Sequence, residues 1–278
     1  MLDNDIEINN EKISVIMGIY NCAETLPTAI DSIINQTYTN WELIMCDDAS
    51  TDNTYEVALS YKKKYPDKII LLQNEVNSKL SFSLNHCLKY ANGKYVARMD
   101  GDDISDSMRF EKQINFLRKN SEFDLVGSYM QRFDGDKYAD VVKCIENPDR
   151  YTLKNKNPFF HATILTYKRV YDKLGGYTVS KRTTRAQDYD LWFRFYFAGF
   201  KGKNLPEVLY YVRENSSAIK RRTFKSRWNS FKTTVIGFKL LNYPKIWIVK
   251  AFLVNVLKSF TPACFVVVYR KIQSLIKK

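Results

Sequence analysis

The sequence predicts an α/β protein with a mostly parallel sheet flanked by helices. Between residues 13 and 103, short apolar segments rich in branched side chains alternate with longer segments in which apolar residues recur at helical spacing. Alternation of this kind produces parallel strands joined by right-handed helical crossovers. Polar or acidic residues follow several of the strand segments. They are therefore expected at the carboxyl edge of the sheet, where such folds bind ligands.

The expected elements follow one another in a regular order. The first segment, Ile13 to Tyr20, has the length and branched content of a buried strand. A helix follows, because Leu26, Ala29 and Ile33 share one face and Pro27 lies in the first turn, where a missing N–H matters little. Further strands are expected at residues 41–46, 69–72, 95–99, 125–131 and 161–165, and further helices end near residues 65, 91, 120 and 198, while residues 134–157 are left unassigned.

Composition indicates an ordered globular chain on the cytosolic side. Of the 278 residues, 45% are hydrophobic and 26% are charged, which suits one large domain with or without an appendage. Residues 1–12 are polar and lack the basic start and apolar run of a secretory signal. The five cysteines form no Cys-x-x-Cys pair and only two histidines accompany them, so we expect buried free thiols and no zinc site.

The segment Met99-Asp100-Gly101-Asp102-Asp103 carries three carboxylates directly after an expected strand. Carboxylates this close repel one another unless a cation neutralises them, and Mg²⁺ or Mn²⁺ held this way can bind a diphosphate. Asp-Gly-Asp is also ordinary turn chemistry. Tyr20-Asn21 and Asp47-Asp48 end two other strands and favour the binding interpretation. The chain has no Gly-rich phosphate loop, so a metal would have to hold the phosphates.

These segments resemble the family 2 glycosyltransferases with the GT-A fold, over about Ile13 to Arg213. In this order and spacing the set is specific, although each member alone is weak. The resembling segments are Val15-Ile16-Met17 with Tyr20-Asn21, Ser32-Ile33-Ile34-Asn35-Gln36-Thr37, Asp47-Asp48-Ala49-Ser50-Thr51-Asp52, Asn85 with Ala91-Asn92-Gly93, Arg98-Met99-Asp100-Gly101-Asp102-Asp103, Gly175-Gly176-Tyr177 and Gln187-Asp188-Tyr189-Asp190-Leu191-Trp192.

The resemblance implies roles for individual residues. Tyr20 and Asn21 would lie against the nucleobase, and Asp48 would accept its imide N–H, as in recognition of uracil or thymine. Asp100 would lie near the ribose and the metal, and Asp102 would be the main carboxylate on Mn²⁺ or Mg²⁺. Arg98 and Arg213 would face the donor diphosphate or would be ordinary cations. His161 would touch the acceptor or the diphosphate, or would be a strand histidine satisfied by its neighbours.

Asp188 would be the catalytic base, because family members invert the anomeric centre in one displacement. A carboxylate in the first turn of a helix suits this role, since the helix dipole favours its ionised form. The sequence departs from the family pattern at two positions. Gln187 replaces a frequent Glu beside the base, on the acceptor side. Lys79, in Asn77-Ser78-Lys79, stands where relatives often have Gly, and it could still face the donor.

The net charge of +13 is concentrated at the C-terminal end. Residues 215–278 contain 14 Lys or Arg and no Asp or Glu, which leaves 29 basic and 30 acidic residues in the first 214. Residues 244–278 are also apolar, but lysines interrupt every run before the roughly 20 residues that span a bilayer. Near the C-terminus, apolar residues recur at helical spacing, which predicts a helix lying on anionic lipid. These residues are Phe265, Val268, Ile272, Leu275 and Ile276.

The stripe between residues 246 and 260 has a second interpretation, a helix packed against the catalytic part. Nucleic acid is a poorer partner than a membrane, because phosphate contacts seldom require this much aliphatic surface. We therefore expect a polar extension at residues 1–12, a GT-A glycosyltransferase domain at 13–214, and a basic, apolar helical tail at 215–278 that associates with an anionic membrane surface through 244–278.

The predicted function is inverting, metal-dependent transfer of a sugar from a nucleotide-sugar, foremost a UDP-sugar, to a glycan hydroxyl. The acceptor would be lipid-linked or an oligosaccharide in the synthesis of a cell-surface polysaccharide such as O-antigen or capsule. The enzyme would be cytoplasmic and peripheral at the inner face of the cell membrane. Two alternatives are a nucleotidyltransferase and a peripheral membrane scaffold with an inactive sugar-nucleotide fold, although the presence of Asp48, Asp102 and Asp188 argues against a scaffold.

Overall fold

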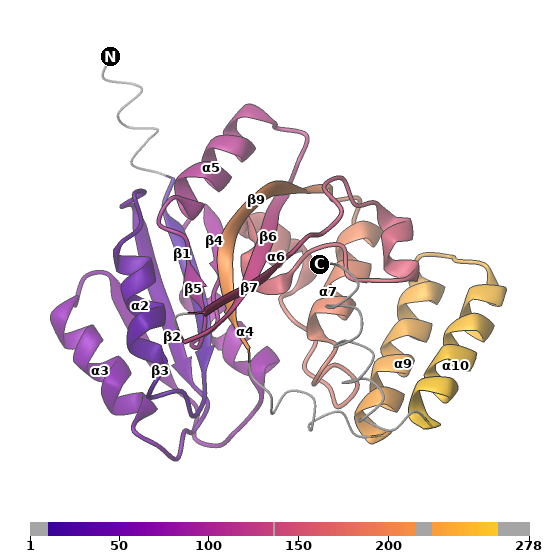
Figure 1. Cartoon of the computed structure of the whole chain (residues 1–278), viewed down its shortest axis with the longest axis horizontal. Helices are drawn as coiled ribbons and strands as arrows, with labels where there is room; N and C mark the ends of the chain where they lie inside the picture. The colour runs from indigo at the N-terminus through magenta and orange to yellow at the C-terminus, as the bar shows by residue number, and fades with distance from the viewer. Residues whose placement is uncertain (1–10, 136, 215–223, 261–278) are drawn as a thin grey trace.

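A computed structural model describes residues 11–135, 137–214 and 224–260 of the chain. The first half alternates strands and helices as the sequence predicts (Figure 1). The elements of this half are β1 (Ile13–Ile19), α2 (Leu26–Ile34), β2 (Trp41–Asp47), α3 (Thr54–Lys64), β3 (Ile69–Gln73), α4 (Leu80–Tyr90), β4 (Tyr95–Arg98), β5 (Ile104–Ser105) and α5 (Arg109–Lys119).

The second half completes the sheet and adds helices at one end of the molecule. Its strands are β6 (Leu125–Asp134), β7 (Lys137–Val142), β8 (Leu165–Tyr167) and β9 (Gly202–Arg213). Two 3₁₀ turns, η1 (Arg150–Lys154) and η2 (His161–Thr163), lie between β7 and β8. The helices are α6 (Lys168–Leu174), α7 (Gln187–Phe197), α9 (Phe224–Leu240) and α10 (Lys245–Phe260).

The described strands form one mixed sheet in the order β3-β2-β1-β4-β8-β6-β9-β5, with β7 paired to β6. Strands β1 to β4 are parallel to one another, as the alternation of strands and helices in the sequence predicts. Strand β8 is antiparallel to both β4 and β6, whereas β9 is parallel to β6. The carboxyl ends of β1, β2 and β4 therefore meet at one edge.

Alternate side chains of the strands enter two apolar clusters on opposite faces of the sheet. Val15 of β1 and Leu43 of β2 pack with α2, α3 and α5 in one cluster. Ile16 and Ile44, the next residue on each strand, pack with α4, α6 and α7 in the other. Helices therefore cover both faces of the central strands, whose side chains are mostly apolar and buried.

Three expectations differ from the structure. Residues 161–165 were expected as one strand, but His161–Thr163 form a 3₁₀ turn and only Leu165–Tyr167 pair in the sheet. The turn forms because the Thr163 N–H and Oγ1 both donate to the Phe160 carbonyl, at 3.0 and 2.9 Å. Residues 134–157, left unassigned, contain β7 and η1, and β9 was not anticipated.

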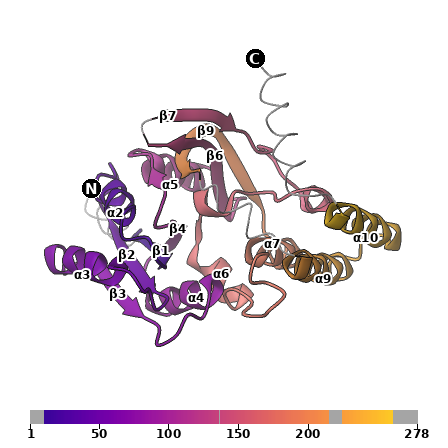
Figure 2. The ribbon, with the colours of Figure 1, turned by 60° about the horizontal axis from the view of Figure 1, so that its bottom comes forward.

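The C-terminal helices pack beside α7, at the end of the molecule opposite α3 (Figures 1 and 2). Phe238 of α9 contacts Phe193 of α7 with ring centroids 5.8 Å apart, and Trp247 of α10 packs on Tyr243 at 4.9 Å. Trp247, Ile248 and Ala251, on one side of the stripe, thus pack against the apolar cluster of the fold, as the second interpretation predicts. The boundary at residue 214 stays a prediction, and the stripe from Phe265 to Ile276 lies outside the described residues.

Cys22, Cys46, Cys87 and Cys144 are free thiols that are buried or half-buried, as expected, while Cys264 is outside the described part of the chain. Across residues 11–135, 137–214 and 224–260, no helix combines the length and the apolar character needed to cross a membrane.

Candidate active site

The loops after β1 and β2 are tied together by side-chain hydrogen bonds. The Asn21 N–H donates to Ser50 Oγ at 3.1 Å, and Asn21 Oδ1 accepts from the Thr51 N–H at 2.8 Å. Asn21 has a φ of 48°, a left-handed conformation that asparagine tolerates better than most residues. These hydrogen bonds leave Tyr20 47% exposed at this edge of the sheet, where its ring can stack on a flat partner.

Asp48 is buried at the end of β2 and organises the loop after β3. Its carboxylate accepts hydrogen bonds from Asn74 Nδ2 at 2.8 Å and from the N–H groups of Ser78 and Lys79 at 2.8 and 2.9 Å. Lys79 has a φ of 74°, which explains why relatives often have Gly there. Its exposed ammonium group donates to Asn77 Oδ1 at 2.6 Å. Asp48 therefore shapes this loop whatever else it binds.

The acidic motif after β4 is held against the loop after β1. Thr25 Oγ1 donates to the Gly101 carbonyl at 3.1 Å. A Cβ atom on Gly101 would lie 3.0 Å from Cys22 Sγ and 3.1 Å from Ile19 Cγ2, so only glycine fits without a shift. Residues 20–22, 47–52 and 100–103 thus converge on one rim, as the sequence predicts.

The three carboxylates of the motif have different partners. Asp100 forms an ion pair with Arg98. Asp103 is buried and accepts the Arg213 N–H at 2.8 Å. No other described residue donates a hydrogen bond to the Asp102 carboxylate. Burial, followed by the charge of Asp100, raises the pKa of Asp102, and the charges of Arg98 and Arg213 only partly offset these effects.

Arg98 occupies the centre of this region. Its guanidinium is 1% exposed, and Nη2 is committed to Asp100. Nε and Nη1 are buried and have no hydrogen-bond partner among the described residues. The positive charge acts on Asp102 and on Asp188 of α7, where it favours the ionised carboxylates. Among the described arginines only Arg98 has two buried guanidinium nitrogens without a partner, which makes it the candidate site for an anion.

Asp188 lies in the first turn of α7, as predicted. Its carboxylate accepts from Asn157 Nδ2 at 2.6 Å and from the Tyr189 N–H at 2.7 Å. Burial raises the pKa of the Asp188 carboxyl, against the effects of these hydrogen bonds and of Arg98. A raised pKa makes the ionised carboxylate a stronger base, and the neighbouring hydrogen-bond donors favour the ionised form. Gln187 precedes it as the first residue of the helix.

His161 belongs to a line of three hydrogen-bonded side chains. Its Nε2 lies 2.7 Å from Tyr177 Oη, which lies 2.7 Å from Tyr171 Oη. Burial, helped by Arg98, lowers the pKa of His161, so the imidazole is neutral at pH 7. Asn85 of α4 fixes Tyr177, because its amide bonds both the Tyr177 carbonyl, at 2.8 Å, and the Tyr177 N–H, at 2.7 Å.

Comparison with known proteins assigns the family. The sequence profile described as glycosyl transferase family 2 matches residues 14–183, more than half of the chain. EpsE of Bacillus subtilis, described as a glycosyltransferase, is 49% identical over 215 residues, which are 77% of each chain. The chain belongs to glycosyltransferase family 2. WfaP of Escherichia coli, named as a UDP-Glc:α-D-GlcNAc-diphosphoundecaprenol β-1,3-glucosyltransferase, is 27% identical over 77% of this chain and 82% of its own.

Solved structures confirm the GT-A fold of this glycosyltransferase. Staphylococcus aureus TarS 1-349 in complex with UDP superposes with a TM-score of 0.65 and 18% identity, over 82% of this chain and 65% of TarS 1-349. The mannosyltransferase PcManGT of Pyrobaculum calidifontis, solved with GDP-Man and Mn²⁺, gives a TM-score of 0.61 and 18% identity, over 95% of this chain and 80% of PcManGT. At this identity both comparisons concern the fold alone.

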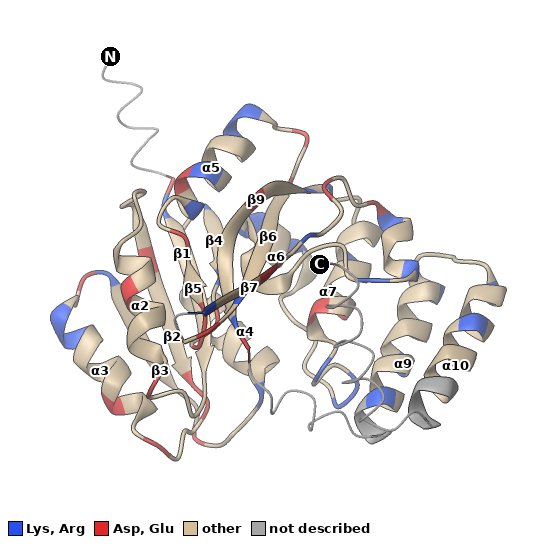
Figure 3. Cartoon of the chain, in the orientation of Figure 1, with Lys and Arg blue, Asp and Glu red and all other residues tan. Residues whose placement is uncertain are grey.

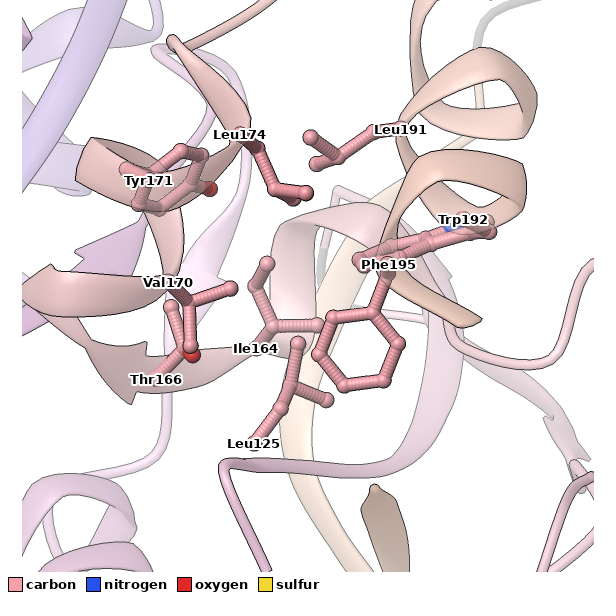
Figure 4. A pocket seen from close by; sticks show the side chains of 9 residues that line it. All are labelled: Leu125, Ile164, Thr166, Val170, Tyr171, Leu174, Leu191, Trp192 and Phe195. Atoms are coloured by element: carbon pink, nitrogen blue, oxygen red, sulfur yellow. The ribbon is translucent and has the colours of Figure 1, made fainter. Parts of the chain in front are cut away.

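A small apolar cavity lies within the apolar cluster that contains α6 and α7. Its volume is about 10 Å³, and it lies between β8, α6 and α7 (Figure 4). Ligand sites usually exceed roughly 300 Å³ and carry polar groups, so this gap in the packing is not the donor site. Its lining consists of Leu125, Ile164, Thr166, Val170, Tyr171, Leu174, Leu191, Trp192 and Phe195.

The carboxylates after β4 suit a divalent cation only if the substrate supplies further ligands. Among the described residues, no group of three or more His, Cys, Asp or Glu side chains has an arrangement that could hold a metal ion. Asp102, with the oxygen of Asp100 that does not face Arg98, offers hard carboxylate ligands that suit Mg²⁺ or Mn²⁺. These residues therefore fit a cation shared with a diphosphate and do not form a closed protein site.

Sequence reasoning missed two residues that complete the site. Asn157 contacts Asp188 but comes from the unassigned segment at residues 134–157, which offers no local signal. Asn74 links Asp48 to Ser83 Oγ, with Nδ2 at 2.8 and 3.0 Å from the two oxygens. Its position directly after β3, at the same edge as Asp48, is the signal that could have identified it.

Proposed function

We propose that this glycosyltransferase inverts the anomeric centre of a UDP-sugar while it transfers the sugar to a lipid-linked glycan. The observation that carries the proposal is the set of groups around Arg98. Two of its nitrogens are unpaired, Asp102 has no donor from another described residue, and Asp188 is close enough to sense the Arg98 charge. An anionic diphosphate next to Arg98 would supply the missing partners of the guanidinium.

The donor would lie along the rim made by the loops after β1, β2 and β4. Tyr20 and Asn21 would contact the base, with Asp48 accepting the imide N–H beside its existing partners. Arg98 and Arg213 would stabilise the charge of the departing nucleoside diphosphate. Lys79 would lie at the outer edge of the donor, because its ammonium is exposed. UDP suits this arrangement, since its base offers an imide N–H, and WfaP is named as using UDP-Glc.

Asp102 and Asp100 would hold Mn²⁺ or Mg²⁺, which when bound supplies positive charge against the diphosphate oxygens. The GT-A neighbour PcManGT was solved with Mn²⁺, which supports a divalent cation in this fold. The protein side of this proposal rests on Asp102, because Asp100 is already paired with Arg98 and Asp103 already accepts the Arg213 N–H.

Asp188 would take the proton from the acceptor hydroxyl as the acceptor oxygen bonds to the anomeric carbon. The bond from that carbon to the diphosphate oxygen breaks in the same displacement, and its electron pair leaves with UDP. Attack from the opposite side inverts the centre, so an α-linked donor gives a β-linked product. His161 and Gln187 would lie on the acceptor side, with neutral His161 able to hydrogen-bond a sugar hydroxyl.

The acceptor would be a polyprenyl-diphosphate glycan used to build a surface polysaccharide at the inner face of the cell membrane. WfaP, named for its diphosphoundecaprenol acceptor, supports this class. The basic C-terminal segment, with 14 Lys or Arg and no Asp or Glu after residue 214, supports work beside an anionic membrane.

The test is calorimetric binding of UDP, GDP, dTDP and CDP with and without Mn²⁺. We expect UDP to bind best, and Mn²⁺ to strengthen that binding in the wild type but not in Asp102→Asn. Asp140→Asn is the matched control, because it removes the same charge from an exposed position on β7. Absence of nucleotide binding under every condition would overturn the proposed donor site and favour the inactive scaffold.

A further inference from the structure

Helix α10 has an exposed apolar stripe along the side that faces away from the protein. Ile246, Val249 and Leu253 recur at helical spacing and are 66%, 51% and 55% exposed. Trp247, Ile248 and Ala251 lie on the other side and pack against the apolar cluster that contains α7 and α9. The helix is therefore apolar on both sides, although only one side is needed for packing.

Lysines border the exposed stripe. At about 100° per residue, Lys245 and Lys250 fall on either side of the line through Ile246, Val249 and Leu253. Both lysines are exposed, and neither forms an ion pair with a described carboxylate. Long lysine side chains beside an apolar stripe can extend their ammonium groups outward while their methylenes remain with the apolar residues.

The charges around the stripe select its partner. Figure 3 shows basic and no acidic residues on the drawn parts of α9 and α10, while acidic residues are spread over the rest of the fold. The chain from residue 215 onward has 14 Lys or Arg and no Asp or Glu. A second copy of this face would bring like charges together, whereas an anionic lipid surface complements both the charge and the apolar stripe.

We infer that the outer face of α10 docks in the interface of an anionic bilayer, with the stripe of Ile246, Val249 and Leu253 among the acyl chains and Lys245 and Lys250 at the phosphates. The inference deepens the proposed function, because it names the surface that would bring the site to a lipid-linked acceptor. Docking itself needs neither donor nor metal, so vesicle binding and nucleotide binding can fail independently.

The test is flotation of the full chain with phosphatidylcholine vesicles that contain about 30% phosphatidylglycerol, and with pure phosphatidylcholine vesicles. We expect binding to the anionic vesicles and much weaker binding to the neutral ones. In the double variant Val249→Asp, Leu253→Asp, binding should fall by at least roughly tenfold, because two charges would enter the apolar layer. The double variant Lys245→Glu, Lys250→Glu should lose the preference for anionic lipid.

Val141→Asp is the matched control, because Val141 is an exposed valine on β7, 41% accessible and distant from α10 in sequence. It should float like the wild type. Since all the substituted residues are exposed, thermal unfolding should show that each variant folds. Wild-type flotation of the Val249→Asp, Leu253→Asp variant would overturn the inference and assign lipid binding to residues 261–278. Loss of a lipid-free dimer in that variant would overturn it in favour of a contact between copies.

Discussion

Asp188 and Asp190 show how two identical residues on one helix turn acquire different roles. Asp190 is buried and forms ion pairs with Arg182 at 2.6 Å and with Arg194 at 2.9 Å, and it accepts from Thr178 Oγ1. These bonds lower the pKa of Asp190 despite its burial, whereas burial raises the pKa of Asp188. Asp190 therefore stabilises the fold, whereas Asp188 is the carboxylate proposed to accept a proton.

Asp188→Asn should therefore reduce kcat by roughly 10²- to 10⁴-fold, the usual contribution of a general base. UDP affinity should remain within about twofold of the wild type, because Asp188 is assigned to the acceptor and not to the nucleotide. The free energy of unfolding at pH 7 should be unchanged or higher, since the variant no longer buries an ionised carboxyl whose pKa is raised by folding. Initial rates, calorimetry and urea unfolding measure these three quantities.

Asp190→Asn is the matched control, and its effect should be the reverse. The two arginines would lose their carboxylate, so stability at pH 7 should fall by about 3 kcal/mol. A lowered pKa means that Asp190 stabilises the fold above its unfolded pKa and that this contribution is lost as pH falls through the folded pKa. The transfer rate of the wild type should decline at acid pH as Asp188 is protonated, with an inflection at a pH above 3.8, the ordinary pKa of Asp. Equal losses of stability in both variants would contradict the division of roles.

At the residue scale, sequence identifies candidate chemistry but not its surroundings. Asp188 could be assigned from the resemblance, and Asp48, Asp100 and Asp102 from the ends of strands. The surroundings of Asp100 depend on residues far away in sequence, such as Tyr210 of β9, whose Oη accepts the Asp100 N–H at 3.1 Å. Asn157 reaches Asp188 across 31 positions from an irregular segment. Contacts of that kind leave no local pattern.

At the scale of elements, the connection between α4 and the loop before α7 decides where His161 lies. The amide of Asn85 bonds both backbone groups of Tyr177, and Tyr177 in turn bonds His161. Gly176 allows this approach, since a Cβ there would lie 2.5 Å from Asn85 Oδ1. Gly175 has the same left-handed backbone, with a φ of 67° against 71°, but open space around it.

The two glycines therefore form a matched pair. Gly175→Ala should cost roughly 1 kcal/mol, the penalty of a left-handed alanine. Gly176→Ala should cost roughly 2 to 4 kcal/mol, because the contact with Asn85 adds to the same backbone penalty. It should also lower the transfer rate, as Tyr177 and His161 shift together. Urea unfolding compares the stabilities, and equal losses for the two variants would show that the Asn85 contact does not constrain the loop.

The elements that sequence predicted well are those whose pattern is local. Strands β1 to β4 are short apolar runs and α2 to α5 have helical spacing, so the parallel half of the sheet could be written down in order. Strand β9 was missed because Pro206 interrupts its pattern, and its pairing with β6 shifts register between Leu205 and Val208. Strand β7 was missed because its residues are mostly exposed and carry little apolar signal.

At the scale of the whole molecule, the helix that carries Asp188 also supports α9 and, through it, α10, whose outer face is proposed to dock on a membrane. Helix α9 packs against α7, and α10 packs against α9. Gly237 of α9 lies against the Phe193 ring of α7, because an added Cβ there would lie 2.1 Å from Phe193 Cδ2. The contact between Gly237 and Phe193 therefore joins the basic C-terminal helices to the near-neutral α/β part, and a change there is expected to reach both.

Gly237→Ala tests this coupling with a known sign. In a helix without tertiary contacts, alanine is favoured over glycine by about 1 kcal/mol, so the substitution alone should stabilise α9. In this chain the methyl group would push α9 away from Phe193, and we expect a net loss of roughly 1 to 3 kcal/mol in the free energy of unfolding. Because α7 moves with Phe193, kcat should fall, while the affinity for UDP, proposed to bind at the rim after β1, β2 and β4, should stay within about twofold.

Lys239→Ala, an exposed position on the same helix, is the control and should leave the free energy of unfolding and kcat unchanged. An increase in stability for Gly237→Ala would mean that α9 and α7 are not packed tightly, and that the C-terminal helices are independent of the catalytic site.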